Sequence, residues 1–386
     1  TTIKDMYLDD LKKLRKEKQM IYKIKEFTAK VTLVQIVFFL AAILSFLIFV
    51  FLTIWSVIQE NELSDQQAAA RWDEEGDSAQ VSCFFAENVK VDEFVLRSFE
   101  KKLDQSLSEV LTQEETEEEN GKRLWIDAYS SLGTITVISE KGKLEEVNAV
   151  GIGGDFFMFH PLQLLSGRYF SGNELMKDAI ILDEDAAWQL FGSNDIAGMS
   201  VMIGGVPHYV SGVVKRPEGR FAKSAGLDKT VVYVSYETLS GYGKTDGINT
   251  YEVVAPNPVK HFVFNCVKEK IGFKENDMVV VENSSRYLPE SLIPVMLDYG
   301  TRSMQNTAVR FPYWENIARG WEDVLALVGL FRIFFLAIPT VILFVFLIKK
   351  WHKRKIHIKD IGIFLTDTKE KMVLKAQREK NKWQDF

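Results

Sequence analysis

The sequence lacks the common signatures of catalytic chemistry. No glycine-rich loop continues into Lys and Ser or Thr, the pattern that holds nucleotide phosphates, so ATP binding by that route is excluded. No motif pairs histidine with glutamate for zinc, and the 5 histidines cannot be joined with serine and aspartate into a triad from their spacing. We therefore expect no catalytic residue, no metal site and no bound cofactor, and an enzyme is the least favoured class.

Cysteine is also scarce, since Cys83 and Cys266 are the only 2 among 386 residues. They either form one disulfide in an oxidising compartment or remain buried free thiols. A chain of this length can bury a sizeable core without cross-links, so the choice leaves the predicted fold unchanged.

Long hydrophobic runs, by contrast, are present twice. The first, residues 31–58, contains few polar residues and continues into Gln59, Glu60 and Asn61 rather than a small-residue cleavage site, which predicts a membrane anchor and not a signal peptide. The second, residues 324–350, includes 16 uncharged residues from Ile333 to Ile348. At about 1.5 Å per residue, both are long enough to cross a hydrocarbon layer of roughly 30 Å as helices.

Two residues of the second run need an explanation. An arginine such as Arg332 costs about 2.5–3.5 kcal/mol near the centre of a bilayer. Either it lies at the outer interface, with residues 321–330 partly outside the membrane, or it pairs with a partner subunit inside the membrane. Pro339 removes one backbone hydrogen bond and is expected to kink the helix.

The charges predict the orientation. Although the chain carries −6 overall, residues 1–30 and 349–386 together carry +11, which leaves −17 for the stretch between them. Lys and Arg collect on cytoplasmic flanks, so both termini are expected inside and the middle is expected outside. Residues 1–30 have a basic amphipathic pattern, which predicts a helix that either lies on the inner leaflet or packs against a partner. The basic ends lack interleaved aromatics, so no nucleic-acid partner is expected.

The exported middle predicts an α+β fold. Residues 79–131 and 250–283 each read as strand, helix, strand, and residues 132–249 between them read as a β-rich insertion. One inserted helix, Glu184–Phe191, should begin after the N-cap Asp183 and end at Gly192. Gly151–Gly154 is expected to be a turn and not a phosphate loop. Residues 59–78 are expected to extend the first membrane helix as a stalk, and residues 284–323 are expected to form a helical stalk before the second.

Five runs follow one another within about seventy residues: Val147–Phe157, Leu164–Phe170, Ala179–Glu184, Ala187–Gly192 with Asp195–Gly198, and Val210–Val214. In their order and spacing they resemble the extracytoplasmic core domain of MacB-like and FtsX-like ABC-transporter permeases. In the tail, residues 351–386, the run Lys359–Leu365 is similar to the family's cytoplasmic coupling element.

The resemblance implies a fold and a set of partners. The fold would have two transmembrane helices flanking an exported domain, made of a split β-α-β (porter-like) subdomain and an inserted β-rich (Sabre-like) subdomain at about residues 132–244 for recognition. A separate ABC ATPase subunit would bind ATP and meet the coupling residues, which are Lys359, Asp360, Ile361, Gly362, Ile363 and Phe364. Further expected partners are a second permease subunit or second copy, the lipid bilayer, and an extracytoplasmic adaptor or hydrolase.

One feature departs from the family, whose permeases usually continue into a third and a fourth membrane helix. This sequence reaches Phe386 without another apolar run, so it is expected to be either half of a split permease or an incomplete sequence. The leading hypothesis is a subunit of a MacB/FtsX-like ABC system in a bacterial cytoplasmic membrane. The alternative is a non-transport scaffold or sensor that regulates a cell-wall hydrolase or binds a peptide. A polysaccharide chain-length regulator is less favoured, because its exported part would be dominated by long helices.

Overall fold

The computed structural model describes residues 32–73, 76–111, 123–302 and 308–353, without the side chains of residues 352 and 353. The chain divides into two compact units, residues 55–329 and the remaining residues at both ends, and each is described by itself. The predicted basic helix at residues 1–30 and the coupling residues 359–364 lie outside the described residues.

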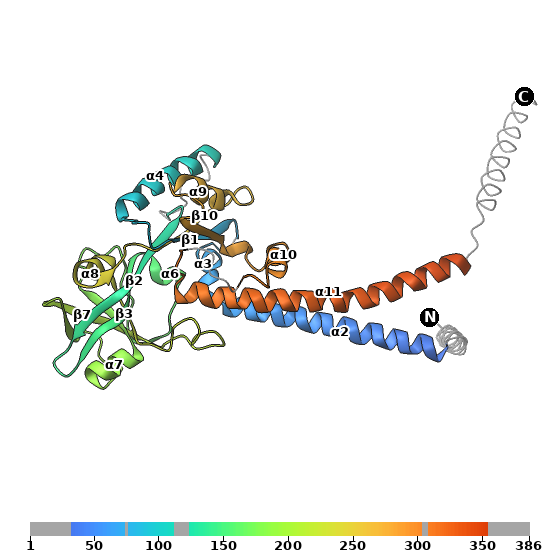
Figure 1. Cartoon of the computed structure of the whole chain (residues 1–386), viewed down its shortest axis with the longest axis horizontal. Helices are drawn as coiled ribbons and strands as arrows, with labels where there is room; N and C mark the ends of the chain where they lie inside the picture. Colours follow the sequence, from blue (N-terminus) through green and yellow to red (C-terminus); the bar gives the residue numbers. More distant parts are fainter. Residues whose placement is uncertain (1–31, 74–75, 112–122, 303–307, 354–386) are drawn as a thin grey trace, which may run out of the picture. The chain divides into compact units, whose positions relative to one another are not determined.

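Two long helices form the candidate membrane spans, α2 (Leu33–Glu62) and α11 (Tyr313–Lys353) (Figure 1). Their most apolar stretches have mean hydropathies of 3.0 and 2.6, and 6% and 0% of those stretches are buried, as expected of helices that face lipid. Within this unit the hydroxyl of Ser45 donates to the carbonyl oxygen of Phe335 over 2.7 Å, so the two apolar segments are in contact.

The porter-like half of the domain is an antiparallel sheet covered by helices. Strand β1 (Ser78–Phe85) lies between β10 (Thr250–Pro256) and β11 (Met278–Glu282), and β10 pairs with β2 (Ile126–Ile138). Helices α4 (Glu93–Val110) and α9 (Phe262–Lys270) share the apolar core of this half. Cys83 and Cys266 both lie in this core as free thiols, so they form no disulfide.

The inserted half continues the same sheet. From β2 the order is β3, β8, β5, β7 and β4, with β6 and β9 joined at the side. The strands are β3 (Lys143–Gly154), β4 (Leu164–Gly167), β5 (Ala179–Asp183), β6 (Ser200–Ile203), β7 (Val206–Val214), β8 (Val231–Ser235) and β9 (Lys244–Thr245). The helices are α6 (Phe156–Phe159), α7 (Glu184–Phe191) and α8 (Tyr236–Tyr242). The boundary placed between residues 131 and 132 therefore falls inside β2.

Helix α7 confirms its prediction residue by residue. The Asp183 side chain accepts a hydrogen bond from the backbone N–H of Ala186, which satisfies one of the free donors of the first turn. Gly192 ends the helix in the left-handed conformation at φ 75°, which glycine adopts without steric cost. Local capping signals were sufficient here.

The turn predicted at Gly151–Gly154 is wrong, because these residues belong to β3. The glycines serve close packing on neighbouring elements instead. A Cβ on Gly151 would lie 2.8 Å from Leu239 Cδ2 on α8, and a Cβ on Gly153 would lie 2.0 Å from Tyr129 Cζ on β2. Helix α8, which the sequence analysis missed, is the element that requires the first of these glycines.

Both predicted stalks are also wrong as continuous helices. After Glu62 the chain breaks into the 3₁₀ turn η1 (Ser64–Gln66) and the short α3 (Ala68–Trp72). Between β11 and α11 the helical structure of the described residues is a 3₁₀ turn η2 (Asn283–Ser285) and the nine-residue α10 (Pro289–Leu297). Proline at the start of α10 separates it from η2, since proline is best tolerated in the first turn of a helix.

Candidate functional site

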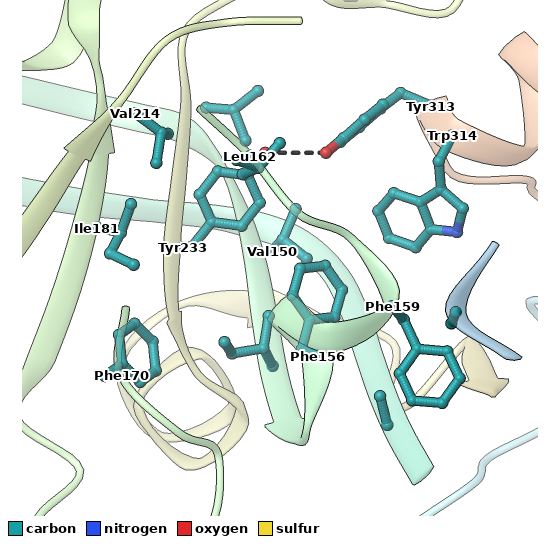
Figure 2. Close-up of a cluster of buried hydrophobic side chains, with 14 of the residues drawn as sticks. Val150, Phe156, Phe159, Leu162, Phe170, Ile181, Val214, Tyr233, Tyr313 and Trp314 are labelled. Carbon is teal, nitrogen blue, oxygen red and sulfur yellow. Dashed lines mark hydrogen bonds between the residues drawn. The ribbon is translucent and has the colours of Figure 1, made fainter. Parts of the chain in front are cut away.

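The first turn of α11 is part of the apolar core of the domain (Figure 2). Tyr313 and Trp314 lie with Phe156, Phe159 and Tyr233 from the inserted half, and the hydroxyls of Tyr233 and Tyr313 are 3.1 Å apart. The Trp314 ring meets the Phe156 ring edge to face, with centroids 5.6 Å apart. Aromatic side chains bury large areas, so this contact fixes the beginning of α11 to the sheet.

A buried ionic cluster holds the next two turns of α11. Arg286, which follows η2, binds Glu315 with two parallel hydrogen bonds of 2.7 and 2.8 Å, and its Nε donates to Glu322. Arg302 also pairs with Glu322 and binds Asp323 over 2.8 Å. Glu315 and Glu322 are seven residues apart and so share one face of the helix. We call Arg286, Arg302, Glu315 and Glu322 the Arg286 cluster.

The segment after α2 is held by a second cluster, centred on His160. This ring is fully buried after α6, with Nδ1 3.0 Å from Asp65 Oδ1 of η1 and Nε2 hydrogen-bonded to Glu252 of β10. Burial alone would lower the pKa of His160, but the charges and hydrogen bonds of Glu252 and Asp65 outweigh burial and raise it to about 9. At neutral pH the ring is therefore a cation that donates to both carboxylates. We call Asp65, His160 and Glu252 the His160 cluster.

A polar bridge across β1 connects the two clusters. Ser82 lies directly opposite Glu252 in the antiparallel register and donates to it over 2.6 Å. Asn283 of η2 donates to Ser82 over 2.7 Å, and its carbonyl oxygen accepts from Arg286 over 3.1 Å. The continuations of both long helices are thus tied to the same strands through one buried chain of hydrogen bonds.

Chemically, this site suits positioning rather than catalysis. Removing one partner from a buried ion pair leaves an uncompensated charge, so the clusters favour one arrangement of α11 and η1 on the sheet. Among the described residues there is no group of His, Cys, Asp or Glu suited to a metal ion.

The sequence analysis missed both clusters. A signal was present in Glu252, a buried charge within the otherwise apolar run Tyr251–Ala255, because such a charge is almost never buried without a partner. Its partners come from distant parts of the chain, so the sequence alone could not identify them.

The residues that were predicted lie elsewhere. Arg332 is half-buried on α11, and in the described part of the chain no ion pair includes it, so its partner stays a prediction. Pro339 lies inside α11, where the kink stays a prediction. The insertion, predicted for recognition, contributes to a cavity of about 1340 Å³. Its wall includes Gly133, Asn148 and Lys229 from the insertion and Arg310 and Arg319 from near the start of α11.

Comparison with known proteins identifies the domain. Residues 84–260 match the model of the MacB-like periplasmic core domain. The macrolide export ATP-binding/permease protein MacB of Agrobacterium fabrum is 28% identical over 162 residues, which are 39% of this chain and 24% of that protein. MacB of Chromobacterium violaceum is 32% identical over 99 residues, 25% of this chain and 15% of that protein. The match thus spans about a quarter or less of each of these relatives.

Two solved structures are also similar. The periplasmic region of MacB from Actinobacillus actinomycetemcomitans aligns with a TM-score of 0.36 and 15% identity, over 59% of this chain and 94% of that one. The extracellular domain of the noncanonical ABC-type transporter YknZ from Gram-positive bacteria aligns with a TM-score of 0.32 and 18% identity, over 52% and 99%. On the family-model match and the curated relatives, residues 84–260 are similar to the periplasmic core domain of MacB-like/FtsX-like ABC-transporter permease components, in a chain that also has two candidate membrane helices.

Proposed function

We propose that this chain is the membrane subunit of a MacB/FtsX-like ABC system in a bacterial cytoplasmic membrane, with both termini in the cytoplasm. A separate ATPase subunit binds and hydrolyses ATP, and this chain transmits the resulting motion to its extracytoplasmic domain, for export or for mechanical signalling. One observation carries the proposal: α11 is a single helix from Tyr313, inside the domain core, to Lys353 at the end of its apolar segment.

The geometry suggests how motion passes along α11. A continuous helix of 41 residues is about 60 Å long, and backbone hydrogen bonds hold its turns together except where Pro339 removes one of them. Tyr313 and Trp314 join its first turn to the aromatic core, and the Arg286 cluster fixes Glu315 and Glu322. A displacement of α11 therefore cannot leave the sheet unmoved unless these buried contacts break.

The ATPase contact is proposed at residues 359–364. The test is to purify the full chain from its native membranes with Lys359→Glu together with Gly362→Pro, and to measure the ATPase that accompanies it. We expect a loss of at least tenfold. Lys369→Glu, outside the coupling residues, is the matched control and should leave the yield unchanged. Unchanged association of the double variant would contradict this contact.

The alternative function, a membrane scaffold or sensor for a cell-wall hydrolase or peptide, is supported by the cavity of about 1340 Å³ beside the insertion. Its size and its polar wall suit a peptide segment or the loop of a partner protein. The two functions differ in energetics. Partner binding that follows the nucleotide state of the associated ATPase supports transmission, whereas binding that is independent of nucleotide supports the scaffold.

A further inference from the structure

Helix α10 (Pro289–Leu297) is apolar on two opposite faces. On one face Leu292 and Val295 are buried in a small core with Leu325 and Ala326 of α11. On the other face Ile293 and Leu297, one helical turn apart, are 52% and 80% exposed. A helix of a water-soluble domain normally presents polar residues on its second face.

The outer face of α10 carries one exposed ion pair among apolar residues. Pro289 and Pro294 lie beside Ile293 and Leu297 on the exposed side of the helix. The one acidic residue of α10, Glu290, pairs with Lys260 over 2.5 Å. Just beyond the helix, Tyr299 is 52% exposed. An exposed apolar stripe of this kind marks a surface that contacts something other than water.

The position of α10 along α11 indicates what contacts its exposed apolar face. Glu322 and Asp323 are the last acidic residues of α11, and its apolar run begins at Val324. α10 packs on α11 (Figure 1) just after this transition, at Leu325 and Ala326. Met296 covers Gly329 so closely that a Cβ on Gly329 would lie 2.7 Å from Met296 Cε. The helix is therefore attached at the boundary between the polar and apolar parts of α11.

Aromatic residues gather at the same level. Trp55 near the end of α2 belongs to the α10 core, and its ring centroid is 6.2 Å from that of Trp321 on α11. Tyr287 packs there as well. Trp and Tyr are enriched where membrane helices leave the hydrocarbon, since their rings combine an apolar body with a polar edge.

From this placement we propose that α10 is an interfacial helix, whose face of Ile293 and Leu297 lies in the outer headgroup region of the lipid bilayer beside α11. It differs from a free amphipathic helix because its second face is occupied by α11 and not by water. Its role is to set the depth and tilt of α11 where the helix leaves the membrane. The proposal requires that α11 cross the membrane, and it does not require the ABC function.

The test attaches an environment-sensitive fluorophore to Leu297→Cys in the full chain in phosphatidylcholine nanodiscs. Leu297 is largely exposed, so the substitution spares the core, and the unsubstituted chain measures any labelling of the buried Cys83 and Cys266. Spin-labelled lipids carrying the quencher at the headgroup or deep in the acyl chain then report depth. Phe344→Cys, in the apolar part of α11, is the membrane reference, and Phe94→Cys, at the start of α4, is the water reference.

We expect at least half of the Leu297→Cys fluorescence to be quenched by the headgroup label, with weaker quenching by the deep label and almost none at Phe94→Cys. Emission that is shielded from water but insensitive to both lipid labels would overturn the proposal in favour of a protein on this face, either a second copy or another subunit. Emission typical of water would overturn it in favour of a free surface. Deep quenching at Phe344→Cys checks separately that α11 crosses the membrane.

Discussion

The two long helices enter the domain in different ways. α11 continues unbroken into the core and begins there at Tyr313, whereas α2 ends at Glu62 and is followed by η1 and α3, two pieces of three and five residues. The first arrangement suits a rigid connection and the second suits a joint, because short helical pieces can reorient at the residues between them. The two long helices of this chain are thus not equivalent.

The chemistry of the two attachments differs in the same sense. The Arg286 cluster on the α11 side rests on a guanidinium that stays charged at every physiological pH. The His160 cluster on the α2 side rests on an imidazolium whose charge is lost in mildly alkaline solution. The rigid side is therefore held by a permanent charge and the jointed side by one that titrates.

Arg286→Leu should have the largest effect, because it leaves Glu315 and Glu322 buried without their main partner. We expect a loss of about 3–5 kcal/mol in the free energy of unfolding of the domain. Chemical denaturation of the full chain in detergent, followed by tryptophan fluorescence, measures it. Arg97→Leu is the control, since Arg97 pairs with Glu93 on an exposed helix surface and should cost under about 1 kcal/mol. Equal losses in the two variants would show that the Arg286 cluster holds α11 no more firmly than an exposed ion pair would.

Alkaline pH should weaken the α2 side selectively. The pKa of His160 is raised in the folded state to about 9, so the protonated ring contributes its full stabilisation below its unfolded pKa of about 6.5 and loses it as pH rises through about 9. The raised pKa corresponds to roughly 3 kcal/mol. The measurement is the difference in unfolding free energy between the native chain and His160→Gln from pH 6 to 9.5.

This difference isolates His160 from other groups that titrate nearby. Burial raises the pKa of the Cys83 thiol, which makes the folded state less stable at alkaline pH in both proteins. Burial likewise raises the pKa of Tyr233, but its effect begins only above about 10, the tyrosine pKa in an unfolded chain. A difference that stays constant over the whole range would show that His160 is neutral in the fold.

Arg71 offers a smaller test of the same side. From α3 its guanidinium donates to the carbonyl oxygens of Met158, Phe159 and Ser64 at 2.7, 3.1 and 2.6 Å, and so ties the joint to the segment before His160. Arg71→Lys keeps the charge but loses the planar set of donors. We expect Arg71→Lys to lower the free energy of unfolding by about 1–2 kcal/mol. In this variant, amide hydrogens should exchange faster in α3 than in the first turns of α11. Equal exchange rates in the two segments would contradict the joint.

The sequence predicted the features that depend on neighbouring residues and missed those that depend on residues far apart in the chain. Helix α7 was predicted with its correct bounds because Asp183 and Gly192 act on their own turns. The stalks were predicted wrongly, because helical composition does not show where packing breaks a helix. Arg286 and Glu315 are 29 residues apart, and His160 and Glu252 are 92 apart, so these pairs depend on the sheet topology and leave no local pattern.

Ser45→Ala should have the smallest effect, and it extends the comparison to the apolar segments themselves. The Ser45 hydroxyl donates to the Phe335 carbonyl over 2.7 Å, and such bonds between membrane helices contribute only about 0.6 kcal/mol on average, because the separated helices also find partners. Thermal unfolding in nanodiscs should therefore change little, with Thr53→Ala, whose hydroxyl bonds within its own helix, as the control. A loss above about 2 kcal/mol would mean that the apolar segments are themselves firmly joined. In that case a joint after Glu62 could not let α2 and α11 move independently, and the distinction between a rigid and a jointed helix would hold only for the domain between the two apolar segments.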